Sequence, residues 1–299
     1  MAQKRRSSQR RPQRRHNGPA YVAPVLDPTW KSPYGASGEE REGRESAIRR
    51  SATRQLIVSA VVGVVAAVAV ALAGYYVISL VVIVVAALFG ALALRRGTRQ
   101  IDSALDLAAS LITRFEVGGT PNDRLRLSTI AERLSATFGL DGVACMVVSD
   151  PAPNAALLMD RNGYSLLVTT GMMNDAELIE LEGVVAHCMA RQRLGYLQLS
   201  AAAASQTSDS PVGRLFHRLC PDFAFRADEV AAATIRYPVG LAGALRRCEG
   251  ATVAATSYFA SDAFRTERVV WFDPYLDRRD MNDGDRNVAG VRAAALEEW

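Results

Sequence analysis

Residues 55–94 carry no charged side chain, and this run limits the possible folds of the chain more than any other feature. A single helix through it would be about 60 Å long, roughly twice the hydrocarbon thickness of a bilayer. Two spans, at residues 56–72 and 77–94, fit a membrane far better. Ala-Gly-Tyr-Tyr at residues 73–76 would form the turn, with both tyrosines at interface level. The sequence therefore predicts a two-helix transmembrane hairpin over residues 54–96.

Arginines flank both outer ends of this hairpin. They are Arg49, Arg50 and Arg54 before the first span, and Arg95, Arg96 and Arg99 after the second. The positive-inside rule then places both outer ends in the cytoplasm. We expect a cell-membrane protein with two spans, with both termini and the main domain cytoplasmic and with membrane lipid as a partner.

Residues 1–53 are expected to form a basic tail. Residues 1–16 contain seven Lys and Arg side chains and no acidic one, and the rest is rich in Pro, Gly, Ser and charge. Such a segment cannot bury enough apolar surface to offset the entropy lost on ordering. We predict a disordered, lipid-facing cytoplasmic tail. No nucleic-acid partner is expected, because no aromatic side chains alternate with the basic ones.

The sequence pattern of the rest of the chain predicts a fold of the α+β class, with a mainly helical domain around a small β-sheet. Apolar residues at helical spacing indicate a connector helix that leaves the membrane, and Asn162-Gly163 is a strong hairpin signal. The predicted elements are a connector helix at 101–115 within segment 97–120, a helix at 125–138, strands at 142–148, 155–159 and 164–170, and a mobile linker at 201–213.

The four cysteines are widely scattered, and no Cys-x-x-Cys pair occurs. This spacing indicates free thiols in a reducing compartment. Histidines are scarce: only His16, His187 and His217 are present. A shifted metal site would have to combine His187, Cys188, His217 and Cys220. His217 and Cys220 are one helical turn apart, but the adjacent His187 and Cys188 point about 100° apart on a helix. This set therefore suits one metal ion poorly.

Residues 180–191 read Glu-Leu-Glu-Gly-Val-Val-Ala-His-Cys-Met-Ala-Arg, which has the frame of a zinc-peptidase helix. In that helix two histidines four residues apart bind the metal, and the glutamate after the first activates water. Here only His187 is present, with Cys188 in the place of the glutamate and Arg191 in the place of the second histidine. A guanidinium has no lone pair for a metal, and its charge opposes a cation. Asn174, three residues before Glu177, is a capping-box arrangement that would open this helix.

The order of these elements resembles the HtpX-type membrane zinc metallopeptidases over residues 55–250. The matching features are the apolar double span, the strand ending in Ser149-Asp-Pro-Ala-Pro-Asn154-Ala155, Val168-Thr-Thr-Gly171-Met-Met173, the helix with His187, and Arg226-Ala227-Asp228 with its continuation to residue 245. In the family a glutamate three residues before the Ala-Asp pair is the third zinc ligand. Ala224 stands there in this chain. The aspartate that matches Asp228 orients a ligand histidine.

The resemblance implies a zincin-like domain at residues 121–250 with an extension at 251–299, in which residues 288–296 could form a closing helix. It implies a catalytically degenerate member, with His187, Cys188, Arg191, Ala224 and Asp228 as vestigial site positions. We therefore expect a pseudopeptidase without catalytic residues, bound metal or other cofactor. Its expected role is binding or regulating proteins at the membrane, in membrane-protein quality control. Extended peptide segments would pair with an edge strand through Tyr164, Leu166, Val168 and Thr170.

Two alternatives stay open. One is an active membrane zinc metalloendopeptidase with a shifted ligand set, and the other is a structural scaffold that binds no peptide. The degenerate reading also predicts a new ion pair. Without zinc the Asp228 carboxylate needs a positive partner, so we expect Arg191 to pair with it across two helices. Otherwise Arg191 would point to solvent.

Overall fold

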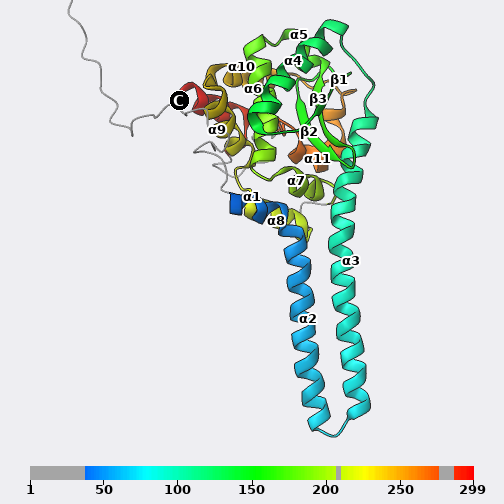
Figure 1. Cartoon of the computed structure of the whole chain (residues 1–299). Helices are drawn as coiled ribbons and strands as arrows, with labels where there is room; N and C mark the ends of the chain where they lie inside the picture. Colours follow the sequence, from blue (N-terminus) through cyan, green and yellow to red (C-terminus); the bar gives the residue numbers. More distant parts are fainter. Residues whose placement is uncertain (1–37, 207–209, 276–285) are drawn as a thin grey trace, which may run out of the picture. The chain divides into compact units, whose positions relative to one another are not determined.

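The computed structural model describes residues 38–206, 210–275 and 286–299. The described part is mostly helical, with one three-stranded sheet and two apolar helices near its start (Figure 1). The predicted disorder at residues 1–37 lies outside the described residues. Over residues 38–53 the prediction of disorder is wrong, because helix α1 (Gly38–Glu45) and the start of helix α2 (Ala47–Leu72) occupy them. Tertiary contacts hold this segment: Arg44 donates to the Leu194 carbonyl at 3.2 Å.

Helices α2 and α3 (Tyr76–Arg114) form the predicted hairpin, and each is long and apolar enough to cross a membrane. Gly74 makes the turn with a φ of +85°, a conformation that favours glycine. Small residues allow the two helices to approach closely. A Cβ on Gly63 would lie 2.2 Å from the Ala86 Cβ. The Ser79 hydroxyl donates to the Ala67 carbonyl across the pair at 2.9 Å.

The second span and the predicted connector are one continuous helix. Helix α3 runs for 39 residues without a break, and its later turns bury Ala104, Ala108 and Leu111 in the domain core. The predicted boundary between residues 96 and 97 therefore falls inside a helix. The arginines there interrupt the apolar run but not the helix, because Arg is a good helix former.

The sheet contains β1 (Val143–Val148), β2 (Ala155–Asp160) and β3 (Gly163–Thr169), in the order β1-β3-β2. β2 and β3 form the expected antiparallel hairpin, and β1 pairs with β3 in parallel. The Asp160 carboxylate closes the turn by accepting from the backbone N–H groups of Asn162 and Gly163.

β3 is the central strand, so the prediction of a peptide-binding edge at Tyr164, Leu166, Val168 and Thr170 is wrong. Leu166, for example, lies opposite Cys145 on one side and Leu157 on the other. Thr170 lies beyond the strand, as the first residue of the next helix. The backbone groups that a peptide would need are already paired within the sheet.

The remaining helices surround this sheet and one another. They are α4 (Pro121–Phe138), α5 (Thr170–Asp175), α6 (Leu178–Arg193), α7 (Leu197–Ala204), α8 (Pro211–Leu219), α9 (Phe223–Ile235), α10 (Pro238–Gly250), η1 (Tyr258–Ala260), α11 (Asp262–Glu267), η2 (Arg268–Val270) and α12 (Ala289–Glu297). Gly183 brings α6 against α10, because a Cβ there would lie 2.8 Å from the Leu241 Cα. Helix α12 confirms the expected closing helix at residues 288–296.

Two local predictions need correction. The proposed linker at 201–213 contains the end of α7, whose alanines are buried, and the start of α8; residues 207–209 lie outside the described residues. Alanine is the best helix former, so a small-residue run need not be a loop. The capping box of α6 is built from Glu177 and Glu180, not from Asn174 and Glu177. The helix therefore begins three residues later than predicted.

Candidate functional site

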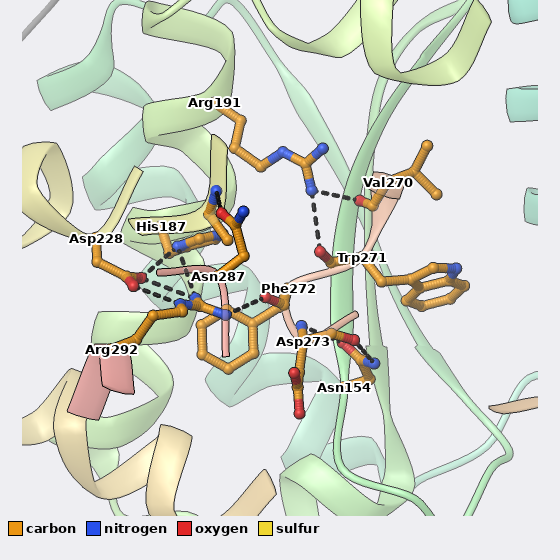
Figure 2. A network of polar contacts seen from close by, with 11 residues as sticks. Asn154, His187, Arg191, Asp228, Val270, Trp271, Phe272, Asp273, Asn287 and Arg292 are labelled. Carbon is orange, nitrogen blue, oxygen red and sulfur yellow. Dashed lines mark hydrogen bonds and ion pairs between the residues drawn. The ribbon is translucent and has the colours of Figure 1, made fainter. Parts of the chain in front are cut away.

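Helix α6 brings His187 and Arg191 to the centre of the domain. The two residues are one helical turn apart, and their exposed fractions are 0% and 1%. Figure 2 shows them pointing into one polar network with residues of α9, α12 and the segment after η2. An apolar helix such as α6 buries these polar groups only because partners surround them.

His187 and Arg292 share the carboxylate of Asp228. His187 Nδ1 lies 2.6 Å from Oδ1, while Arg292 donates from Nε to Oδ2 at 2.6 Å and from Nη2 to Oδ1 at 2.9 Å (Figure 2). The Phe272 ring packs edge-on against the imidazole, with ring centroids 4.9 Å apart. The same ring lies under the Arg292 guanidinium. The Asp228 carboxylate and its two partners therefore connect helices α6, α9 and α12 with the segment that contains Phe272.

Burial and these partners set the charges of the network. Burial lowers the pKa of His187 to about 4, with Asp228 opposing the shift, so the imidazole is neutral at pH 7. Burial would raise the pKa of Asp228, but Arg292 and then His187 outweigh it, and this pKa stays below its usual value. The proton of the neutral ring belongs on Nδ1, which faces the carboxylate. His187 Nε2 therefore carries a lone pair, and it has no hydrogen-bond partner among the described residues.

Arg191 binds backbone rather than a carboxylate. Its Nη1 donates to the carbonyls of Val270 at 2.8 Å and Trp271 at 3.1 Å, and Nη2 donates to that of Val269. The predicted Arg191–Asp228 pair is therefore wrong, because Arg292 already occupies both carboxylate oxygens. The alternative that Arg191 points to solvent is also wrong, since the side chain is buried.

The segment at residues 269–273, which we call the C-terminal strap, crosses the site next to strand β2. The Phe272 N–H donates to the Ala155 carbonyl at 2.7 Å. Asn154 binds both backbone groups of Asp273, accepting at 3.0 Å and donating at 2.8 Å. Arg292 Nη1 donates to the Phe272 carbonyl at 2.9 Å. All five strap carbonyls thus accept from Arg191, Arg292 or Asn154, which meets the need of a buried segment for backbone partners.

The other two predicted site residues, Cys188 and Ala224, provide neither a metal ligand nor a base. Burial raises the pKa of the Cys188 thiol to about 12, so it is protonated and is neither a base nor a ready nucleophile. Ala224 is buried on α9, where its backbone N–H donates to the Asn287 side chain at 2.9 Å. Its methyl group cannot bind a metal.

These residues do not fit zinc. The unpartnered Nε2 of His187 is a suitable donor atom, but structural and catalytic zinc sites need at least three protein ligands. Arg191 and Arg292 bring two guanidinium groups to this site. No group of three His, Cys, Asp or Glu side chains in the described ranges could hold a metal ion. The shifted set of His187, Cys188, His217 and Cys220 is thus not assembled there.

The roles of Arg292, Asn154 and the strap were not predicted from the sequence. Arg292 left a detectable signal: it lies between Ala289, Ala293 and Leu296, the buried positions of α12. An arginine inside an apolar stripe requires a buried acidic partner. Asn154 was noted only as part of a motif, and no local pattern marks the strap.

Comparison of the sequence with known proteins gives a distant resemblance. No model of a known protein family matches the chain. Two curated relatives, each named Protease HtpX homolog, come from the Twist and TW08/27 strains of Tropheryma whipplei. This chain is similar to HtpX homologues. It is 30% identical to each, over 43% of this chain and 58% of the relative.

The similarity supports a distant relationship to HtpX-like proteases, and it spans less than two thirds of the relatives' length. With the two apolar helices it suggests a membrane protein. The relatives' printed name describes proteases. Arg191 and Ala224 stand at two of the three positions where the resemblance leads us to expect zinc ligands.

Proposed function

We propose that this chain is a membrane-anchored, HtpX-like pseudopeptidase with a zincin-like domain on the cytoplasmic side. It binds or regulates proteins at the membrane and does not cleave them. Its partners are membrane lipid and membrane proteins, and quality control of membrane proteins is the process that the resemblance suggests.

One observation carries this proposal: the guanidinium of Arg191 is buried at the second ligand position and binds three strap carbonyls. A metal at that position would have to displace both the guanidinium and the strap. The strap also donates a hydrogen bond, from the Phe272 N–H, to the Ala155 carbonyl of β2, the strand nearest the site. In an active relative an extended substrate would pair with an edge strand there. In this chain an internal segment fills that role, so partners bind elsewhere or must first displace it.

The competing function is an active metalloendopeptidase with a shifted ligand set. The unpartnered Nε2 of His187 favours it, because this atom is free to bind one metal ion. A structural scaffold that binds no partner protein is the third candidate. Metal content separates the first two, and capture of membrane proteins by crosslinking separates the first from the third.

The deciding experiment measures metal and cleavage in the same preparation. The full chain, purified in detergent, is assayed for zinc by mass spectrometry and for casein cleavage with and without a chelator. We expect well below one zinc per chain and no chelator-sensitive cleavage. His187→Ala serves as the ligand-deletion variant, and His217→Ala is the matched control on an exposed histidine. Stoichiometric zinc that is lost in His187→Ala but kept in His217→Ala would overturn the proposal.

A further inference from the structure

A cavity of about 500 Å³ lies where α2, α3 and α8 meet, and none of its described lining residues belongs to the His187 network. Its polar lining consists of Ser51 and Gln55 from α2, Arg96 and Gln100 from α3, and Arg214 and Arg218 from α8. No acidic residue occurs among its described lining residues. The cavity therefore combines a positive field with neutral hydrogen-bonding groups.

With the hairpin in a bilayer, as proposed above, the cavity would lie where hydrocarbon gives way to headgroups. The uncharged run of the hairpin ends at Arg54 on one side and Arg95 on the other. Gln55 and Arg96 are the neighbours of these two residues and both line the cavity. Toward the turn of the hairpin the next large side chains, such as Val58 and Leu92, are exposed and apolar. Acyl chains would meet this apolar surface directly below the cavity.

Helix α8 supplies the outer wall, and its two sides differ sharply. Val212 and Phe216 are buried against the domain, while Arg214 and Arg218, one turn apart, are exposed. Figure 1 shows α8 close to the start of α2. Neither Arg96 nor Arg218 forms an ion pair with an acidic side chain in the part of the chain that the structure describes. Arginines without acidic partners are available for an external anion.

We propose that this cavity binds the phosphate of an anionic phospholipid, such as phosphatidylglycerol, in the leaflet at the domain end of the hairpin. Arg96 and Arg218 bind the phosphate oxygens, since the guanidinium fork matches phosphate geometry. Gln55, Gln100 and Ser51 offer hydrogen bonds to headgroup hydroxyls. Basic pockets between membrane helices are a known form of lipid headgroup site. The proposal rests on the membrane anchoring in the proposed function, and not on the loss of catalysis.

The test counts lipids on the full-length protein. The chain is delipidated in dodecyl maltoside and mixed with phosphatidylglycerol or phosphatidylcholine, and native mass spectrometry measures bound lipid. The test variant is Arg96→Gln with Arg218→Gln. The control, Arg95→Gln with Arg99→Gln, removes the same number of charges from the part of α3 around Arg96, outside the cavity lining. We expect the parent chain to retain one phosphatidylglycerol. Its affinity for this lipid should fall about fivefold for each cavity arginine removed and should be unchanged in the control.

Each other outcome contradicts the proposal. Equal losses in both variants would indicate diffuse attraction without a site. Equal retention of phosphatidylcholine would remove the role of charge. Binding of inorganic phosphate as tight as that of the lipid would identify a soluble anion as the ligand. Carbonate extraction of native membranes is the separate control. Release of the chain would contradict the proposed membrane anchoring itself. A chain that stays in the membrane but binds no phosphatidylglycerol would contradict only the lipid site.

Discussion

Arg292 and Asp228 form a bidentate ion pair inside the domain, with Nε 2.6 Å from Oδ2 and Nη2 2.9 Å from Oδ1. This pair joins α12 to α9 and also orients His187 on α6. Asp228, which the resemblance leads us to expect beside a ligand histidine, therefore has a guanidinium partner in this chain.

Replacing Arg292 by methionine should destabilise the domain strongly. The change leaves the Asp228 carboxylate buried with only a neutral histidine beside it, and losing one partner of a buried pair costs about 3–5 kcal/mol. Chemical unfolding in detergent, followed by tryptophan fluorescence, measures the free energy of unfolding. A double-mutant cycle with Asp228→Asn then isolates the coupling between the two side chains.

The control for this cycle is the pair of Arg246 and Glu297, which also ties α12 to the domain. Its geometry is bidentate too, at 3.0 and 2.9 Å, but both side chains are exposed. Solvent screens such a pair, so Arg246→Met should lose far less stability. Similar losses of unfolding free energy for Arg246→Met and Arg292→Met would mean that burial does not make the Arg292 pair more stabilising than an exposed pair.

Replacing Arg191 by methionine should loosen the strap. Three carbonyls lose their donor, and leaving a buried polar group without a partner costs about 1–3 kcal/mol. Hydrogen exchange of the Phe272 and Asp273 amides should accelerate. Arg191→Lys should not restore protection, because one ammonium cannot reproduce the planar fork. Arg133→Met, on an exposed arginine of α4, is the control. Unchanged strap exchange in Arg191→Met would show that the guanidinium does not hold the segment.

The pH dependence of stability should contain two opposing contributions. The pKa of His187 is lowered from 6.5 to about 4 in the folded state, chiefly by burial. Its contribution is present above pH 6.5 and is lost as the pH falls toward 4. The pKa of Asp273 is raised from 3.8 to about 6, again chiefly by burial, with Arg292 opposing. Its contribution is present below pH 3.8 and is lost as the pH rises through 6.

Single variants separate these two contributions. Asp273→Asn removes the acidic one, so this variant should lose more stability than the parent chain between pH 6.5 and 4. His187→Gln removes the other, and its stability should rise on acidification over the same range. Denaturant midpoints measured at several pH values test both. Parallel pH profiles for the parent and both variants would contradict the assigned shifts.

Topology gives a fourth prediction. Arginines flank both outer ends of the hairpin, so a reporter fused after Trp299 should read as cytoplasmic. A reporter placed in the turn at residues 73–76 should lie on the opposite side. A cytoplasmic signal from the turn fusion would mean that the hairpin does not cross the membrane.

Composition and periodicity predicted the hairpin and the three strands, because each follows from local sequence, whereas the closing helix was expected from the family resemblance. The order of the strands did not follow, since β3 acquires its central place from a parallel pairing with β1, which local alternation cannot reveal. The partner of Arg191 was missed for a related reason. It lies 78 to 80 positions away in a segment without regular periodicity. Long-range backbone contacts of this kind leave no trace in spacing.

One continuous helix, α3, forms both half of the proposed membrane anchor and a wall of the domain core, and it is about 58 Å long at 1.5 Å per residue. Within this helix Gly97 packs closely against α2, because a Cβ there would lie 2.6 Å from the Ala52 Cβ. When the hairpin tilts to match a thinner bilayer, the buried turn at Ala104, Ala108 and Leu111 must tilt with it. In the proposed membrane-anchored state, bilayer thickness would therefore act mechanically on the folded domain.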